Sequence, residues 1–549
     1  MDYEKLANLL FSNEIKDINY YIEKYPKRNL DEKALVTRFA PSPTGFIHMG
    51  SLYTAFINDT FAHQTNGIFF LRIEDTDQKR IVENGIEGII KDLKDYNFDI
   101  NEGPNIGGEY GPYIQSERKD IYQAFAKSLV LKGIAYPCFC DDKTLEEIRF
   151  SQERSKKRLG YYGKYARCRS LTYEEIENNI KNNIPFVVRL KSSGNFENKI
   201  VLNDKIKGKI EMPENDLDVV ILKSDGIPTY HFAHAVDDHL MGTTTVIRGD
   251  EWVSSFPIHY ELFNTLGFEL PSFAHIAPLT KKDEETGNIR KLSKRHDPEA
   301  SVSYYTEKGI PNYVVKLYLA TILNPDFEPW YIANYDKKYN EFKFDFSKMS
   351  IGGSLFDINK LMSISKIYFS HLKASELYEE TLNYNKIYDK SFSELLEKYK
   401  EYTINILNIE REIPRPRKDI DSYSSVKNII SYMYDELFDK EYKDLEIKEF
   451  YNSELLEDYV NNYYSENDTK EEWFNKIKEL APKYNFASET KEYKLNPESY
   501  KGSIADVCEL IRVAVTGRRE TPDLYEILKL LGKEKIKERI ELFKNKIER

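Results

Sequence analysis

The sequence predicts a multidomain protein whose first half is α/β, interrupted by an α+β segment, and whose second half is all-α. Strand-like and helix-like runs alternate from Ala34, as they do when helices connect the strands of a parallel sheet. Between Tyr136 and about Pro213, basic loops and short runs of alternating polarity replace this pattern. After Pro298 the chain is almost entirely helix-like, with charged and apolar residues at helical spacing.

The individual elements follow from the same patterns, taken in chain order. Residues 1–33 are predicted to form one or two short helices that end near Pro26, before the first strand. The first half then has strands at 34–36 and 68–73 and helices at 52–62, 84–96 and 113–132. The interrupting segment has a helix at 171–182 and a strand at 186–190, and residues 219–222 are expected to resume the first sheet. The all-α half includes helical stretches at 375–404 and 533–549.

The most informative segment, residues 41–51, joins the first strand to the helix predicted at 52–62. A helix start presents unpaired backbone N–H groups and a positive dipole end, which suit an anion such as a triphosphate. Gly50 lets a ligand approach the backbone closely, and His48 can donate a hydrogen bond to a phosphate oxygen. A His-x-Gly pair alone is a weak signal, so its interpretation depends on the residues around it.

Bulk composition limits the class of protein. The 549 residues are enough for several domains, since single cores stop growing near ~250–300 residues. No run of ~18 apolar residues predicts a transmembrane helix, and the N-terminus lacks a secretory pattern. Four cysteines are too few for a disulfide framework. We therefore expect a cytoplasmic protein with no membrane partner.

The charge distribution bears on nucleic-acid binding. A formal net charge of −12 argues against it, because nucleic acid usually selects basic surfaces. Local clusters count for more than the total. Residues 154–169 hold seven basic residues and no acidic one, and a second basic cluster comprises Lys281, Lys282, Arg290, Lys291, Lys294 and Arg295. Each cluster is either a solvated loop, which is the usual case, or part of a face that binds RNA.

Four blocks, in order between Thr37 and Arg295, resemble the signatures of glutamyl-tRNA synthetases, which are class I aminoacyl-tRNA synthetases. They lie at residues 37–50, 69–77, 228–252 and 291–295, and a weaker match covers 510–519 and 530–534. The chain has Pro-Ser-Pro-Thr-Gly and Ile-Glu-Asp-Thr-Asp, where glutamine-specific relatives usually carry Pro-Glu-Pro-Asn-Gly and Phe-Asp-Asp-Thr-Asn. The resemblance implies a class I Rossmann-like parallel-sheet catalytic domain with an inserted α+β domain, followed by C-terminal helical domains.

This resemblance divides the chain into six parts. They are an N-terminal extension (1–33), the first half of the catalytic domain (34–135), an inserted acceptor-end-binding domain (136–215), the second half of the catalytic domain with its lysine loop (216–300), a stem-contact region (301–375) and a helical anticodon-binding domain (376–549).

The implied activity is that of a glutamate–tRNA ligase, which forms glutamyl-adenylate from ATP and L-glutamate and transfers the glutamyl group to the 3′ end of tRNA-Glu. Neither step needs a protein nucleophile, so positioning and stabilisation of phosphate charge should dominate catalysis. Mg²⁺ is expected to accompany ATP. The resemblance gives His48 and Lys294 as catalytic residues and places ATP contacts at His48, Gly50, Glu251, Trp252, Lys291, Ser293 and Lys294. Ser51 stands where class I enzymes usually have a second histidine.

Glutamate binding follows from its charge. A guanidinium fork binds a carboxylate in two places, and the resemblance gives Arg38 and Arg248 this role, with Tyr230 as a hydroxyl donor. It also pairs Glu74 with the substrate ammonium and Ser42 with the amino-acid backbone. His234 stands where many family members carry Asn, and it either touches the substrate or packs. Each of these residues could instead serve a structural salt bridge or packing role.

Cys138, Cys140 and Cys168 resemble the zinc ligands of some glutamyl enzymes. The fourth ligand there is often a His or Tyr two residues after the third cysteine, and here that residue is Ser170. Structural zinc normally takes four ligands, and Tyr161, Tyr162 or Tyr165 would complete the set poorly. The alternatives are a degenerate zinc site and three reduced thiols, and the sequence favours the thiols.

The sequence is also compatible with other functions. A non-discriminating enzyme would also glutamylate tRNA-Gln, and a glutamine-specific relative is a weaker alternative. The long helical half argues against both a shortened paralogue that modifies a tRNA base and a small-molecule nucleotidyltransferase. The presence of Arg38, His48 and Lys294 argues against an inactive RNA-binding module. We expect a monomer.

Overall fold

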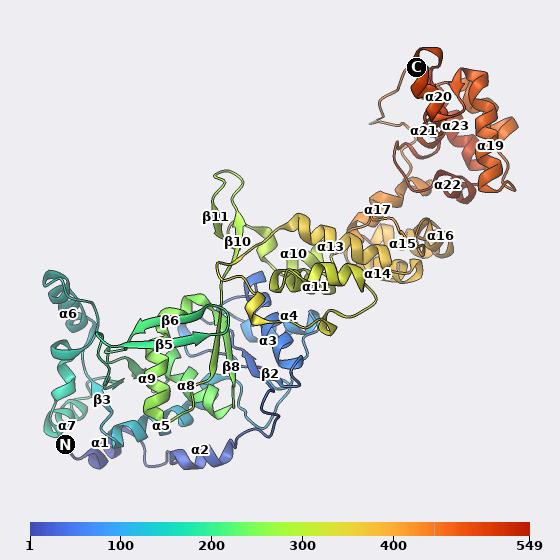
Figure 1. Ribbon diagram of the computed structural model, residues 1–549. Coiled ribbons are helices and arrows are strands. Elements are labelled where there is room, and N and C mark those ends of the chain that lie inside the picture. The colour runs from blue at the N-terminus through green and yellow to red at the C-terminus, as the bar shows by residue number, and fades with distance from the viewer. Residues whose placement is uncertain (444, 549) are drawn as a thin grey trace. The chain divides into compact units, whose positions relative to one another are not determined.

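The computed structural model describes residues 1–443 and 445–548, which form two compact units. Unit 1 comprises Met1–Tyr304 and Lys316–Ile358, and unit 2 comprises Tyr305–Val315 and the chain from Asn359 onward. Figure 1 shows that unit 1 mixes strands with helices, whereas unit 2, coloured from yellow to red, is built almost wholly of helices. The mixed first half and helical second half predicted from the sequence are therefore confirmed.

The parallel sheet of unit 1 begins with β1 (Val36–Phe39) and β2 (Ile68–Leu71), which pair in parallel register. Helix α3 (Met49–His63) connects the two strands, as expected for a crossover between parallel neighbours. All four residues of β1 are buried, which is typical of a parallel strand covered on both faces.

A second sheet of four strands, in the order β6-β5-β9-β8, adjoins the first. The strands β8 (Thr245–Gly249) and β9 (Ser272–Ile276) are parallel, and β9 also runs parallel to β5 (Lys199–Asp204), which forms a hairpin with β6 (Gly208–Pro213). The two sheets adjoin where the Thr244 backbone N–H donates to the Val36 carbonyl at 3.0 Å. Helices α8 (Tyr230–Leu240) and α9 (Phe256–Leu266) flank β8 in the chain.

A separate antiparallel sheet of order β3-β4-β7 combines strands of the inserted segment with β7, which follows that segment in the chain. It consists of β3 (Ala135–Cys138), β4 (Val187–Leu190) and β7 (Val220–Leu222), with helices α6 (Asp142–Arg154) and α7 (Tyr173–Lys181) between β3 and β4. The expectation that residues 219–222 resume the parallel sheet is thus wrong, and β5 pairs in parallel with β9 instead. A short apolar run shows that a strand is buried but does not identify its pairing partner.

The N-terminal extension forms two short helices before Pro26, as predicted: α1 (Tyr3–Leu10) and α2 (Ile18–Lys24). Leu6 and Tyr21 are buried in one core with helix α5 (Lys119–Leu131). Arg28, just beyond the extension's helices, forms a bidentate pair with Glu102 at 2.7 and 2.8 Å. Its Nε also donates to the carbonyl of Met241, the residue that caps the C-terminus of α8. The extension therefore stabilises the end of α8, the helix that starts at Tyr230.

The remaining elements of unit 1 are α4 (Gly85–Asp95), the hairpin β10 (Leu279–Lys282) and β11 (Ile289–Lys291), α12 (Phe327–Ala333) and β12 (Ser354–Leu355). The boundary between the units passes through α10 (Ser303–Glu307) and α11 (Asn312–Leu323) and just after the first residue of α13 (Ile358–His371).

A large apolar core of unit 2 contains buried residues from Phe369 to Phe543. Its further elements are α14 (Ala374–Tyr388), α15 (Lys390–Lys398), α16 (Lys400–Asn408), α17 (Tyr423–Ile430), α18 (Ser453–Asp458), α19 (Lys470–Leu480), β13 (Phe486–Ala487), α20 (Thr490–Leu495), β14 (Gly502–Ser503), α21 (Ile504–Thr516), α22 (Leu524–Leu531) and α23 (Lys533–Ile547). The stretch predicted as helical at 375–404 is broken at Asp389 and Tyr399, whose backbones leave the helical region. Among the described residues, no helix has both the length and the apolar character needed to cross a bilayer.

Candidate functional site

A cavity of about 1140 Å³ opens at the carboxyl ends of β1, β2 and β8, where ligands of parallel α/β sheets usually bind. A second cavity of about 640 Å³ shares His48, Glu251 and Lys294 with it. The first is lined by Arg38, Ser42, His48, Glu74, Tyr230, Arg248, Glu251, Trp252 and Lys294, and the second by His48, Gly50, Glu251, Lys291, Ser293 and Lys294. The fold thus brings together every residue predicted to bind ATP or glutamate except His234.

His48 is the residue that caps the N-terminus of α3. Its Nδ1 accepts a hydrogen bond from the Ser51 backbone N–H at 3.1 Å, so the ring proton lies on Nε2. Desolvation and the charges of Lys294 and Lys291 lower the pKa of His48 to about 4. The ring is therefore a neutral donor at physiological pH. A Cβ on Gly50 would lie 3.1 Å from this ring, which explains a glycine at that position.

The lysine loop follows the β10–β11 hairpin, and the carboxylate of Asp297 holds it in place. Arg290 donates to both oxygens of Asp297 at 2.6 and 2.8 Å, and the Ser293 backbone N–H donates to the same carboxylate at 2.9 Å. Lys294 donates to the carbonyl of Phe46, in the turn before α3, at 2.6 Å. Within the described residues, Lys291 and Lys294 have no carboxylate within 4.0 Å, so both charges are available to an anionic ligand.

Asp238 forms an ion pair with Arg38, which together with Arg248 forms the basic wall of the larger cavity. Its carboxylate lies 3.1 Å from Arg38 Nε and 2.7 Å from Arg72 Nη1, and Arg72 Nη2 donates to Glu74 at 2.9 Å. Burial alone would raise the pKa of Asp238, but the two guanidinium groups and His234 hold it well below its usual range. The pKa of Glu74 is raised, because burial outweighs the effect of Arg72 and Arg38. The charge of Arg38 is therefore already balanced within the protein.

Arg248 is surrounded differently. Its nitrogens contact the imidazoles of His275, His234 and His259 at 3.0, 3.4 and 3.2 Å, and its pKa is lowered mainly by burial. Tyr230, at the start of α8, lies between this region and Trp252, with ring centroids 4.1 Å apart. His234 is fully buried and lines neither cavity, so its position favours the packing alternative over direct contact with a substrate.

Several residues of this site had no predicted role. Asp238 and Arg72 lie inside the matched signature blocks, but sequence alone did not show that they pair. His259 and His275 lie outside the blocks, on α9 and β9. The chain has only nine histidines, and four of them gather here, yet no spacing rule could have joined residues from three separate elements.

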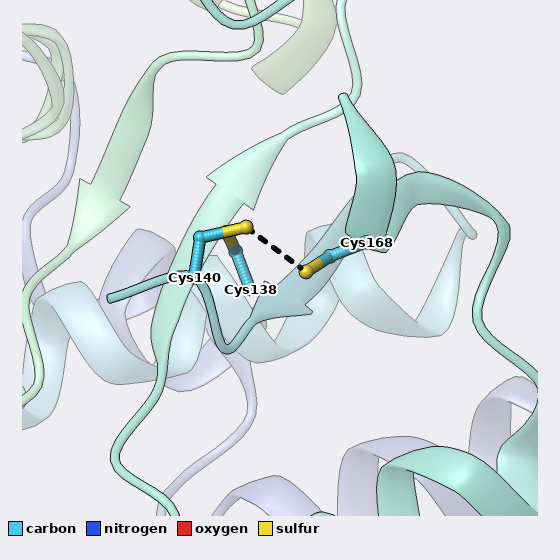
Figure 2. A group of neighbouring side chains, drawn as sticks. All are labelled: Cys138, Cys140 and Cys168. Atoms are coloured by element: carbon cyan, nitrogen blue, oxygen red, sulfur yellow. Dashed lines mark hydrogen bonds between the residues drawn. The ribbon is translucent and has the colours of Figure 1, made fainter. Parts of the chain in front are cut away.

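The three cysteines of the inserted segment converge, as Figure 2 shows, with their sulfur atoms within 4.8 Å of one another. Cys140 and Cys168 are 3.6 Å apart at Sγ. The hydroxyl of Tyr161 lies 3.4 and 3.3 Å from the sulfurs of Cys138 and Cys140 and accepts a hydrogen bond from the Cys168 backbone N–H. A hydrogen bond from Cys168 lowers the pKa of the Cys138 thiol to about 4, against the effect of burial.

The chain matches two family models. Residues 34–324 match the model described as tRNA synthetases class I (E and Q), catalytic domain. Residues 498–543, inside unit 2, match an anticodon binding domain. The first match spans the whole of the site described above.

Full-length relatives are similar to the chain from end to end. It is 48% identical to a glutamate–tRNA ligase of Acetivibrio thermocellus, over 98% of this chain and 100% of that protein. It is 46% identical to a glutamate–tRNA ligase of Clostridium perfringens strain 13, over the same shares of both chains. Its structure is similar to that of a glutamate tRNA ligase from Elizabethkingia meningosepticum in complex with its amino acid, with a TM-score of 0.73, 27% identity and coverage of 93% of this chain and 99% of that one.

Proposed function

The chain belongs to the family of class I tRNA synthetases for glutamate and glutamine, and we infer from this and from its site that it is a glutamate–tRNA ligase. It activates L-glutamate with ATP and transfers the glutamyl group to tRNA. The observation that carries the choice of glutamate is that Arg38, Arg248 and the carboxylate of Glu74 all line the larger cavity. Two guanidinium groups suit the side-chain carboxylate, and one carboxylate suits the ammonium group.

In the first step, an oxygen of the glutamate α-carboxylate bonds to the α-phosphorus of ATP, and the bond to pyrophosphate breaks. Negative charge grows on the phosphate oxygens, and a preorganised cation there lowers the barrier. We assign this work to Lys294, with Lys291 beside it, because both residues line a cavity and neither has a carboxylate partner in the described part of the chain. The neutral His48 ring donates from Nε2, and Mg²⁺ would supply further positive charge when it accompanies the ATP phosphates.

In the second step, a ribose hydroxyl at the 3′ end of tRNA attacks the acyl carbon and AMP leaves. The inserted segment with sheet β3-β4-β7 is the proposed binding site of the acceptor end, and unit 2 is proposed to bind the anticodon. The match of residues 498–543 to an anticodon binding domain supports the second assignment. The borders of the six predicted parts, and the monomeric state, stay predictions.

Aminoacylation tests the assignment directly. Labelled glutamate and glutamine should each be offered with purified tRNA-Glu and tRNA-Gln. We expect glutamate to be attached to tRNA-Glu and glutamine to be attached to neither tRNA. Charging of glutamine in preference to glutamate would refute the proposed function. Glutamate found on tRNA-Gln as well would identify the enzyme as non-discriminating.

We also propose that Cys138, Cys140, Cys168 and Tyr161 hold a structural zinc ion. Sulfur ligands at ~2.3 Å on a tetrahedral zinc lie about 3.8 Å apart, close to the 3.6 Å between Cys140 and Cys168. The Tyr161 oxygen, which lies beside the sulfurs of Cys138 and Cys140, would supply the fourth ligand that neither Ser170 nor any histidine of this segment offers. The geometry therefore argues for metal over three reduced thiols.

Metal analysis checks the zinc proposal. The purified protein should carry about one zinc per chain, since four ligands suffice for one structural ion. Cys168→Ser should lose the metal, and Tyr161→Phe should retain less of it on dialysis against a chelator. Cys508→Ser is the matched control, because Cys508 lies in α21, far along the chain from this cluster. Protein free of zinc, or a disulfide between Cys140 and Cys168, would contradict the proposal.

The cytoplasmic setting remains part of this proposal. tRNA charging requires tRNA and ATP, and all four cysteines are unpaired, as expected in a reducing compartment.

A further inference from the structure

The guanidinium group of Arg248 is held by uncharged groups, namely three imidazoles and the hydroxyl of Tyr230. Nε donates to His275 Nε2 at 3.0 Å, Nη1 lies 3.4 Å from His234 Nε2, and Nη2 lies 3.2 Å from His259 Nδ1. These histidines come from β9, α8 and α9, so three elements fix one side chain. Within the described part of the chain, no carboxylate lies within 4.0 Å of the Arg248 nitrogens. This differs from Arg38 and Arg72, which both contact Asp238 directly.

A second layer of contacts fixes the tautomer of each imidazole. An imidazole that accepts from a guanidinium at one nitrogen carries its proton on the other. His275 Nδ1 lies 2.7 Å from Asp204, His234 Nδ1 lies 2.7 Å from Asp238, and His259 Nε2 lies 2.9 Å from His231 Nδ1. His275 and His259 can therefore donate away from Arg248 and accept from it, whereas His234 Nδ1 lies near Asp238 without a hydrogen bond. Two carboxylates are linked to the guanidinium only through a neutral ring.

The rings also remain uncharged. Burial lowers the pKa of His231 to about 4 and that of His234 to about 3, and it lowers the pKa values of His259 and His275 as well. The nearby charge of Arg248 acts in the same direction at all four. At neutral pH the three contacts thus use three of the five N–H donors of Arg248 without reducing its positive charge, and they leave donors for a bound carboxylate.

We propose that His259 and His275, together with His234, are positioning residues that orient Arg248 and leave its charge unneutralised, and that they thereby select glutamate over glutamine. The inference rests on the proposed function and adds the groups that make the site charge-selective. A buried cation without a counterion is costly, and a bound carboxylate relieves that cost. The amide of glutamine accepts a hydrogen bond but brings no charge, so it gains much less.

The isosteric pair His259→Asn and His259→Asp tests this selection. The Asn side-chain oxygen can replace Nδ1 as a neutral acceptor, whereas Asp places a carboxylate beside Arg248. The measured quantity is the ratio of kcat/KM for glutamate to kcat/KM for glutamine in tRNA charging, with thermal unfolding as the folding control. We expect His259→Asn to keep the ratio within about threefold, and His259→Asp to reduce it on the order of 100-fold, mainly through the KM for glutamate.

Two outcomes would overturn the proposal: an unchanged ratio in His259→Asp, or an equal loss in both variants, which would indicate a packing role only. If His259→Asp does not fold, the variants His275→Gln and His275→Glu repeat the comparison at the position of His275 Nε2, which contacts Arg248. The ratio of the two kcat/KM values then decides the proposal in the same way. Failure of the wild-type protein to charge glutamate would instead refute the proposed function. The two failures are therefore distinguishable.

Discussion

Replacing Lys294 by alanine should lower the rate of glutamyl-adenylate formation on the order of 100-fold or more, since loss of one preorganised group at a developing charge costs about 10²–10³ in rate. Lys294 lines both cavities, reaches the turn before α3 and has no carboxylate partner among the described residues. Its ammonium group is placed to meet phosphate charge rather than glutamate. The KM for glutamate should therefore change by less than about threefold.

The measurement is tRNA-dependent exchange of labelled pyrophosphate into ATP, at several glutamate concentrations. Lys282→Ala is the matched control, because Lys282 belongs to the same hairpin, is exposed and lines neither cavity. It should react at nearly the wild-type rate. An Lys294→Ala enzyme with an unchanged exchange rate, or one whose only defect is a raised KM for glutamate, would show that Lys294 does not serve the phosphates.

Arg248→Gln should raise the KM for glutamate on the order of 100-fold while leaving the stability of the fold unchanged or improved. The guanidinium group is buried and has no counterion within 4.0 Å among the described residues, so most of its electrostatic stabilisation must come from the bound carboxylate. The lowered pKa of Arg248 means that its charged form destabilises the protein when no glutamate is bound. A neutral amide at this position removes that cost together with the binding.

Arg38→Gln provides the contrast. Arg38 already contacts Asp238, so its removal leaves a buried carboxylate with fewer partners and should cost about 3 kcal/mol of unfolding free energy. Its effect on the KM for glutamate should be smaller than that of Arg248→Gln. Thermal unfolding and glutamate saturation curves of both variants measure the two effects. The reverse order, with Arg248→Gln less stable and better at binding glutamate than Arg38→Gln, would contradict this account of the cavity wall.

The Asp238 contacts also imply a pH dependence that follows the sign of its shift. Its pKa is held well below the usual value for aspartate, so it favours the folded state at any pH above the unfolded pKa. That contribution is lost only as the pH falls through the folded pKa. At neutral pH the basic wall therefore keeps its full electrostatic support.

Much of this protein could be predicted from its sequence because the information is local. Alternating strand-like and helix-like runs identified the α/β half, and turn residues before a helix start identified the segment around His48. The sequence also indicated the ATP- and glutamate-binding residues that line the two cavities, because these residues lie in short blocks whose order and spacing resemble one family. In each case the signal lies within a few residues of the feature.

Only the tertiary structure decided which buried groups meet. Residues 219–222 were predicted correctly as a strand, but their partner, β4, depends on contacts that a short apolar run does not encode. Arg38 and Arg248 have the same side chain and the same predicted role, yet Asp238 neutralises the first and three neutral imidazoles hold the second. Those partners come from α8, α9 and β9, so the charge left for glutamate is set by long-range packing. The sequence by itself determined the family and the chemistry, and the fold determined which of the two cations is free to act, because electrostatic energy depends on distance in space and not on separation along the chain.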